Sequence, residues 1–221
     1  MSRRVLRQAL TITILMLVTV SVGSLASRVS RAAAQSGCVT AVSGGSWQST
    51  TFAAQAGRFT AEFDATPSAS PINAVVGLSQ GAQTAYAGFG CLARFNPSGD
   101  IDARNGGAYG AGSVIPYTGG VTYHFRLTVD VPAHAYSIFV TPPASSEQTV
   151  GSNFAFRTEQ AGVTTLDNRG AFISATPAGT TTVCNLTITP AAATDVGADE
   201  SSTAAITVRP LTTANVGPNA P

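Results

Sequence analysis

Residues 120–143, GVTYHFRLTVDVPAHAYSIFVTPP, place three chemically useful side chains at alternate positions of an expected strand. His124, Arg126 and Asp130 lie between apolar residues. Because successive strand residues point to opposite sides, these polar groups share one face and Tyr123 lies on the other. Such a face is suited to a catalytic site, to a sugar-binding surface or to the solvated side of a sheet.

Other charged side chains also lie on the polar faces of expected strands. Arg94 lies in GCLARFN (90–96), and Arg157 and Glu159 lie in NFAFRTEQ (153–160). If these strands are neighbours in one sheet, their charges form a ladder across it. Arginine forks bind carboxylates through two hydrogen bonds, so the ladder is a platform for an acidic or neutral sugar. The alternative is a set of cross-strand ion pairs, each of which contributes little to stability.

Aromatic residues in loops are candidates for stacking on a sugar ring. Four such residues lie in loop-rich stretches: Tyr86, Phe89, Tyr109 and Tyr117. Of these, we expect Tyr109 and Tyr117 at the rim of a binding site. The complete candidate ligand-binding set is Arg94, Tyr109, Tyr117, His124, Arg126, Arg157 and Glu159. The phenylalanines of the expected strands fall on apolar faces and are predicted to be core residues: Phe59, Phe63, Phe95, Phe125, Phe154 and Phe156.

Three oxygen-bearing side chains in SGDIDARNG are candidates for a calcium site, namely Asp100, Asp102 and Asn105. Calcium takes carboxylate and carbonyl ligands from loops, but such residues also cap turns. A zinc site is not expected, because the chain has two histidines and no CxxC motif among its three cysteines. No other cofactor is expected.

The pattern of the chain predicts an all-β fold. Short apolar runs, such as those at 58–64, 72–80, 90–96 and 180–189, are separated by Gly, Pro and Asn clusters, and helical periodicity is nearly absent. Many strands at short spacing with turn signals between them predict an antiparallel sandwich or barrel. We expect one such domain over residues 35–189.

The two ends of the chain have a different character. A basic start, an apolar stretch of 18 residues and small residues before Ala34 predict a secretory signal over 1–34. Export would use either the general secretory (Sec) pathway or the twin-arginine pathway. The alternative is that the segment is retained as a membrane anchor. Residues 190–221 are small, polar and acidic, which predicts a linker-like tail with one further strand at 202–211.

Charge excludes one class of partner. All twelve basic residues are arginine, and five of them lie in the expected signal. The remaining seven stand against eleven Asp and Glu, a formal charge of −4. Nucleic-acid binding needs a basic field, so we exclude it. An exported chain meets an oxidising compartment, so two of the three cysteines are expected to pair and one to stay free.

Three stretches resemble the concanavalin A-like lectin/glucanase superfamily, with its laminin G-like jelly roll: GRFTAEFDATPSASPINAVVGLSQG, RFNPSGDIDARNGGAY and IPYTGGVTYHFRLTVDVPAHAYSIFVTPP. The resemblance covers about residues 46–189 and extends to jelly-roll modules of secreted bacterial proteins. It implies two stacked antiparallel sheets, one of them concave, with ligands on the concave face or at the loop rim. It also implies adjacent first and last strands, hence a Cys38–Cys184 disulfide. The third cysteine, Cys91, alternates in phase with Ala93 and Phe95, which predicts a small core residue.

The resemblance further implies a secreted, lectin-like module that binds a polysaccharide or cell-surface glycan without cleaving it. A divergent polysaccharide lyase or hydrolase is the second hypothesis, and a structural or adhesion protein is the third. Jelly-roll lyases use a tyrosine with a histidine, so a lyase needs His124, Arg126 and a loop tyrosine in one groove. Glucanases of the superfamily carry three acids on one strand. Glu62 and Asp64 have the spacing of the first two, but no third acid follows them here.

Overall fold

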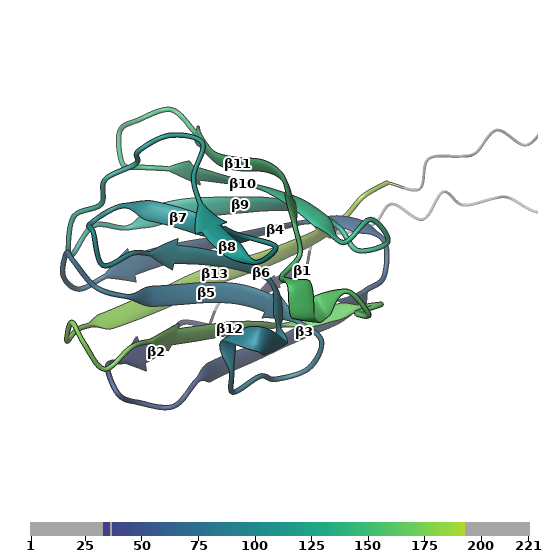
Figure 1. Cartoon of the computed structure of the whole chain (residues 1–221), viewed down its shortest axis with the longest axis horizontal. Coiled ribbons are helices and arrows are strands. Elements are labelled where there is room, and N and C mark those ends of the chain that lie inside the picture. Colours follow the sequence, from purple (N-terminus) through teal and green to yellow (C-terminus); the bar gives the residue numbers. More distant parts are fainter. Residues whose placement is uncertain (1–32, 36, 193–221) are drawn as a thin grey trace, which may run out of the picture.

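The computed structural model describes residues 33–35 and 37–192, which form two antiparallel sheets stacked as a sandwich (Figure 1). The predicted all-β, two-sheet architecture is therefore confirmed. Residues 1–32 of the expected signal lie outside the described residues, as do the tail from residue 193 and the strand expected at 202–211. No helix within the described ranges is long and apolar enough to cross a membrane.

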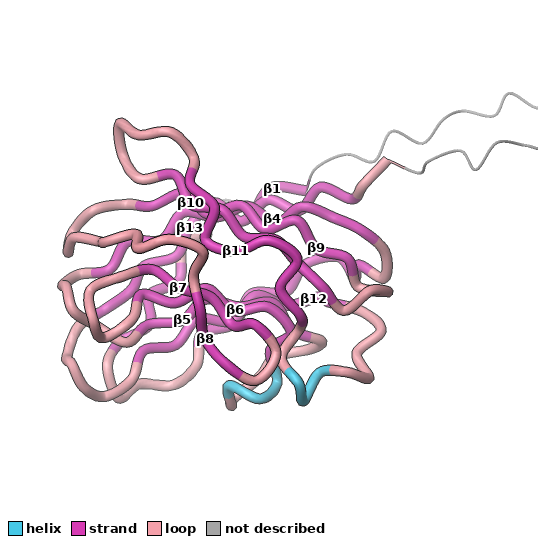
Figure 2. The backbone as a smooth tube through the Cα atoms, turned by 45° about the horizontal axis from the view of Figure 1, so that its top comes forward, coloured by secondary structure: helices cyan, strands magenta, loops and turns pink. Residues whose placement is uncertain are grey.

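Sheet A has seven strands, and most of its connections run over the ends of the sandwich (Figure 2). Its strand order is β1 (Ala33–Gln35), β13 (Thr180–Pro190), β4 (Arg58–Pro67), β9 (Tyr123–Asp130), β10 (Ala135–Thr141) and β11 (Gln148–Ala155). In addition, β2 (Val39–Val42) pairs with β13. The short β1 includes residues on both sides of the expected cleavage point after Ala34.

Sheet B has six strands and faces the viewer in Figure 1. Its strand order is β3 (Gln48–Gln55), β12 (Leu166–Ile173), β5 (Ala74–Ser79), β6 (Phe89–Phe95), β7 (Ile101–Asn105) and β8 (Ala108–Gly110). Two 3-10 turns, η1 (Tyr86–Gly88) and η2 (Thr158–Gln160), lie at one end of this sheet and contact each other.

Alternation along β9 decides which of its side chains face the core. Phe125, Leu127 and Val129 are buried, whereas His124 and Arg126 lie on the outer face of sheet A. This is the arrangement that the period of two predicts for a strand covered on one side. The expected orientation of the strand is therefore confirmed.

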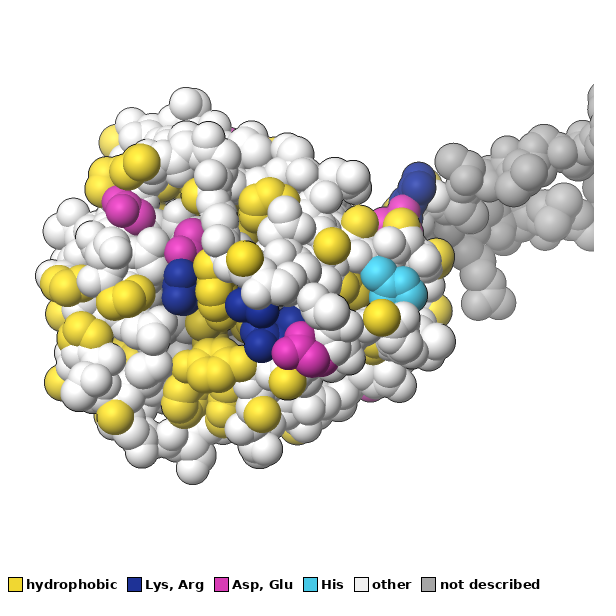
Figure 3. Space-filling model, viewed as in Figure 1, with side chains coloured by type: hydrophobic (Ala, Val, Ile, Leu, Met, Phe, Trp, Pro, Cys, Tyr) yellow, Lys and Arg dark blue, Asp and Glu magenta, His cyan; other side chains and the backbone are white. Residues whose placement is uncertain are grey.

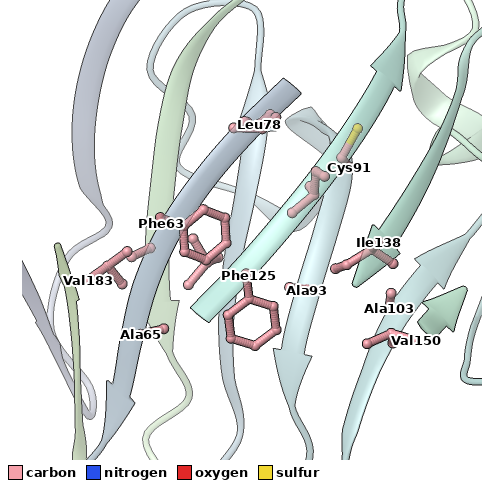
Figure 4. Close-up of a cluster of buried hydrophobic side chains, with 14 of the residues drawn as sticks. Phe63, Ala65, Leu78, Cys91, Ala93, Ala103, Phe125, Ile138, Val150 and Val183 are labelled. Atoms are coloured by element: carbon pink, nitrogen blue, oxygen red, sulfur yellow. The ribbon is translucent and has the colours of Figure 1, made fainter. Parts of the chain in front are cut away.

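Aromatic rings join the two sheets across the core. Phe63 of β4 stacks on Phe125 of β9, with ring centroids 5.3 Å apart. Phe95 of β6, in the other sheet, meets Phe125 edge-on with centroids 5.7 Å apart. Figure 4 shows Phe63 and Phe125 among the buried side chains of both sheets, including Cys91. Cys91 is fully buried and packs as the small core residue expected, and this burial raises the pKa of its thiol well above the ordinary value.

The strand expected over 153–160 ends earlier than predicted. β11 stops at Ala155, and the backbone N–H of Phe156 donates to the carbonyl of His134 in the turn between β9 and β10. The next N–H, of Arg157, donates to the carbonyl of Gly90 in sheet B. The chain therefore crosses from one sheet to the other at these two residues, which moves Arg157 to the outer side of sheet B.

The disulfide implied by the resemblance is present. Cys38 lies between β1 and β2, both of which pair with β13, and Cys184 lies in β13 itself. The two Cα atoms are 4.2 Å apart. The bridge thus ties the first described strands to the last one, and Cys91 remains the free thiol.

Phe125→Ala is expected to lower the free energy of unfolding by about 3–5 kcal/mol, because it removes a fully buried ring and leaves a cavity. Thr128→Ala, on the outer face of the same strand, is the matched control and should change it by less than about 0.5 kcal/mol. Urea unfolding followed by circular dichroism gives both values. Similar losses in the two variants would contradict the assignment of faces.

Replacing Cys38 and Cys184 together by serine is expected to lower the free energy of unfolding by about 5 kcal/mol. The bridge closes a loop of 146 residues, and the loss is the chain-entropy value for that length. Peptide mapping without reductant should recover the Cys38–Cys184 pair and a free Cys91. A bridge that contains Cys91, or unchanged stability after reduction, would show that this pairing is wrong.

Candidate ligand-binding groove

The candidate site residues fall on opposite outer faces of the sandwich. His124 and Arg126 lie on β9 in sheet A, whereas Arg94 lies on β6 in sheet B. The crossover after β11 brings Arg157 to sheet B as well. The single charged ladder across one sheet is therefore not formed. Alternation defines the two faces of each strand, but it does not tell which sheet the strand joins.

The polar side chains of sheet A are paired with one another. His124 Nδ1 lies 2.8 Å from Asp64 Oδ1, and Asn185 Nδ2 donates to Asp64 Oδ2 at 2.7 Å. Arg126 donates to both oxygens of Glu147, at 2.8 and 2.5 Å. Hydrogen bonding between these two side chains raises the pKa of Arg126 and lowers the pKa of Glu147. Sheet A thus carries a face of polar side chains that are hydrogen-bonded to one another.

No tyrosine joins His124 and Arg126 on this face. Tyr123 points into the core, as alternation requires, and its hydroxyl accepts a hydrogen bond from the Thr118 backbone. Tyr109 belongs to β8 in sheet B. Within the described part of the chain, the three groups that a lyase would need do not converge.

The expected position of Tyr117 at a binding rim is wrong. Its side chain is buried in the core, and its hydroxyl accepts a hydrogen bond from the Ile72 backbone N–H at 2.7 Å. The same hydroxyl lies 2.9 Å from the carbonyl oxygen of Asn96. A buried tyrosine hydroxyl needs such partners, and here they join two loops. The glycine-rich surroundings of Tyr117 in the sequence do not show that it is covered.

Of the calcium candidates Asp100, Asp102 and Asn105, the last two have protein partners. Both carboxylate oxygens of Asp102 accept hydrogen bonds from Arg94. Asn105 Oδ1 accepts one from the backbone N–H of Ala155, which joins β7 to the end of β11. Over the described ranges, no three His, Cys, Asp or Glu side chains are grouped so that they could hold a metal ion.

A groove of about 280 Å³ opens on the outer face of sheet B. Figure 3 shows arginine side chains gathered beside hydrophobic ones in a hollow of this face. Every lining side chain is polar or aromatic: Asn73, Tyr86, Arg94, Arg104, Tyr109, Arg157 and Ser174. Three of the candidate residues therefore meet here: Arg94, Tyr109 and Arg157.

Tyr109 holds two of the arginines at one wall of the groove. The Arg94 guanidinium lies 3.6 Å from the centroid of the Tyr109 ring, and that of Arg104 lies 5.1 Å from it. Burial raises the pKa of Tyr109 despite the opposing influence of the arginines, so the phenol stays neutral. Burial also opposes the charge of Arg94, but the hydrogen bond and charge of Asp102 outweigh it and raise the pKa of Arg94. Tyr109 and Arg94 thus keep fixed charge states near neutral pH.

The other wall carries neutral hydrogen-bonding groups. Asn73 Nδ2 donates to Ser174 Oγ at 3.0 Å, and the Tyr86 hydroxyl lies 3.2 Å from the same Ser174 oxygen. Tyr86 begins η1, which is tied to η2 by a hydrogen bond from Gln160 Nε2 to the Ala87 carbonyl at 2.6 Å. The two turns therefore fix the end of the groove.

Aromatic packing continues behind Tyr86. The single tryptophan, Trp47, stacks on Phe89 and Phe172 with centroids 4.8 and 4.5 Å apart, and Tyr86 meets Trp47 edge-on at 5.2 Å. Phe89 is fully buried beneath this cluster, together with Val75 of β5. Sheet B therefore has a second apolar layer on its outer side, which packs against Tyr86 at the edge of the groove.

Two glycines make room for this layer. Gly77 of β5 and Gly170 of β12 are paired across the sheet. A Cβ added at either position would collide with the ring of Phe89, since the ring lies directly over the backbone there. Close approach of a ring to the sheet therefore requires glycine at both positions.

Sequence reasoning missed Arg104, Asn73 and Ser174. Arg104 lies two residues after Asp102 on β7 and so shares its face, a signal that the sequence does contain. Asn73 and Ser174 lie at the ends of β5 and β12, and only the pairing of these strands brings them together. The continuous apolar run of β5 was the available sign that both faces of sheet B are covered.

Comparisons with known proteins find distant similarities. No protein-family model matches the chain. A curated protein from a Bacillus species, described as gellan lyase, is 31% identical over 98 residues, which cover 43% of this chain. The chain spans only 4% of the length of that relative.

Among solved structures, the chain is similar to a metal-free lectin from Griffonia simplicifolia, with a TM-score of 0.48, 9% identity, and coverage of 76% of this chain and 95% of the lectin. It is also similar to a glycoside hydrolase family 131 catalytic domain from Coprinopsis cinerea, with a TM-score of 0.40, 13% identity, and coverage of 60% and 56%. These likenesses are remote, and the two-sheet architecture described above rests on the strand pairing of the chain itself.

Gly170→Ala is expected to displace the Phe89 ring and, with it, Trp47. Because Trp47 is the only tryptophan, its fluorescence reports this change directly, and we expect a shift of its emission to longer wavelength. Overpacking of this kind should also lower the free energy of unfolding by about 1–3 kcal/mol. Gly162→Ala, at a glycine with open space around it, is the control. Unchanged emission in Gly170→Ala would contradict the described packing.

Proposed function

We propose that the protein is a secreted module that binds a glycan in the groove on sheet B and does not cleave it. The observation that carries the proposal is the composition of the groove. Its volume of about 280 Å³ is near the lower end of small-molecule sites, so it accommodates a short part of a sugar chain. Aromatic and polar side chains line it throughout.

The groove matches the two kinds of surface that a sugar presents. The hydroxyl groups of a sugar both donate and accept hydrogen bonds, and Asn73, Ser174 and Tyr86 offer both functions on one wall. The C–H surface of a sugar ring packs well against aromatic rings, and Tyr86 presents such a ring with Trp47 behind it. The preformed wall lowers the entropy cost of binding.

The positions of the acids support binding rather than hydrolysis. Glycosidases use a pair of carboxyl groups that flank the bond to be cleaved. Beside the groove, Asp102 is held by two hydrogen bonds from Arg94, and Glu159 is paired with Arg157. Glu62 and Asp64, which have the spacing of an acid pair, lie on the opposite face of the sandwich.

Further support comes from the context of the chain. A disulfide between Cys38 and Cys184 fits an oxidising, extracellular location, as does the basic and apolar N-terminal pattern. The relative described as gellan lyase is named for a polysaccharide, which supports a carbohydrate ligand. The partner that we propose is accordingly a polysaccharide or cell-surface glycan.

A glycan array probed with the purified full chain tests the proposal. We expect binding to a subset of glycans, and Tyr86→Ala should weaken it by about tenfold, the equivalent of about 1.4 kcal/mol of lost contact. His124→Ala, on the opposite face, is the matched control and should bind as the wild type does. Absence of binding to every glycan, or loss of binding in His124→Ala alone, would refute the proposal. Release of reducing ends or unsaturated sugars would show catalysis instead.

A further inference from the structure

We propose that the groove selects glycans that carry carboxylate groups, with Arg104 and Arg157 as the residues that bind the carboxylate. The inference rests on the proposed function, because it names the class of glycan that the same groove takes. It begins from the uneven distribution of charge. Three of the seven arginines that follow the expected signal line this one groove, in a region of the chain where acids outnumber arginines.

Arg94 is already committed to a protein partner. Its Nε and Nη2 atoms donate to the two oxygens of Asp102, at 2.7 and 2.6 Å. This bidentate geometry leaves little capacity for a ligand. Arg94 instead supports the face of Tyr109 at 3.6 Å, and so positions the ring against which Arg104 lies.

Arg104 has no such partner. Its Nε donates to the carbonyl oxygen of Gly106 at 2.9 Å, which fixes the plane of the guanidinium. In the described part of the chain, no carboxylate forms an ion pair with it. Its two terminal nitrogens are therefore a pair of parallel donors on a side chain that is already oriented, which is the arrangement that matches a carboxylate.

Arg157 is paired with a group that a ligand can replace. Its Nε lies 3.1 Å from Glu159 Oε2 but is not aligned for a hydrogen bond, and its Nη2 donates to Oε1 at 3.2 Å. Glu159 belongs to the short turn η2, and its side chain is 47% exposed, so it can rotate into solvent. We take this carboxylate as the internal substitute for the carboxylate of a sugar acid.

The count of charges at the groove also favours a ligand that carries a carboxylate. The groove and its edge hold three arginines and two carboxylates, so one positive charge remains without a partner. A neutral sugar would cover this charge without compensating it, whereas an acidic sugar would replace water at Arg104 with a charge-assisted hydrogen bond. The two parallel donors of a guanidinium fork match the two oxygens of a carboxylate.

This arrangement predicts opposite effects for two neighbouring substitutions. Arg104→Gln removes the free donor pair and should weaken binding of an acidic glycan by at least about tenfold. Glu159→Gln removes the competing carboxylate and should strengthen it by about threefold to tenfold. Arg126→Gln is the control: it removes an arginine on the opposite face that is paired with Glu147, and it should leave affinity unchanged.

The test compares three acidic ligands with their methyl esters: oligogalacturonate, oligoglucuronate and oligomannuronate. Each ester keeps the sugar and removes the negative charge. Affinities of the full chain and the three variants are measured by calorimetry at about 50 and about 200 mM salt. We expect at least one acid to bind at least about tenfold more tightly than its ester, with the difference lost in Arg104→Gln.

Two results would overturn the inference while the proposed function stands. One is binding of neutral array glycans or esters as tightly as every acid, with no effect of Arg104→Gln. The other is preference for dextran sulfate over all three acids, which would make sulfate the recognised group. If the chain binds neither these probes nor any glycan on an array, the proposed function itself fails. Weaker acid binding in Glu159→Gln would refute the role given to that residue.

Discussion

Burial of both faces of sheet B is the constraint on which the groove depends. One face packs on sheet A, and the other lies under Phe89, Trp47 and Phe172. For this reason every residue of β5 is buried, and glycines stand at 77 and 170, where the Phe89 ring meets the backbone. The rings of the aromatic layer pack against each other, and Tyr86 packs edge-on against Trp47 and Phe172 at the edge of the groove. This wall of the groove is therefore held by packing within the protein itself.

The two outer faces of the sandwich use the same charged residue types in different ways. On sheet A the arginines have nearby acids, as in the pair of Arg58 with Asp130 at 2.6 Å, which lowers the pKa of Asp130. Pairs of this kind on a solvated sheet contribute little to stability and leave little net field. On sheet B the surplus arginine, Arg104, lies in a hollow beside an aromatic ring. A charge in such a hollow attracts an oppositely charged ligand more strongly than one on a flat surface.

Much of the fold could be predicted from the sequence, because period-two alternation is a local property. It correctly assigned Phe125 and Cys91 to the core and Arg126 to an outer face, and the resemblance supplied the Cys38–Cys184 bridge. The candidate site was less predictable. Whether β6 and β9 share a sheet depends on pairing between distant segments, so Arg94 and Arg126 were grouped although they lie on opposite faces. The burial of Tyr117 and the crossover that carries Arg157 likewise follow from tertiary hydrogen bonds.

The most direct test of the binding face is nuclear magnetic resonance of the arginine side-chain Nε–H groups during titration with an acidic oligosaccharide. Each of these groups gives its own signal, and the arginines are divided between the two faces. We expect the signals of Arg104 and Arg157 to shift with ligand concentration, while those of Arg58 and Arg126 on sheet A stay in place. Shifts confined to Arg58 and Arg126, with the groove signals unchanged at saturation, would contradict a ligand site on sheet B.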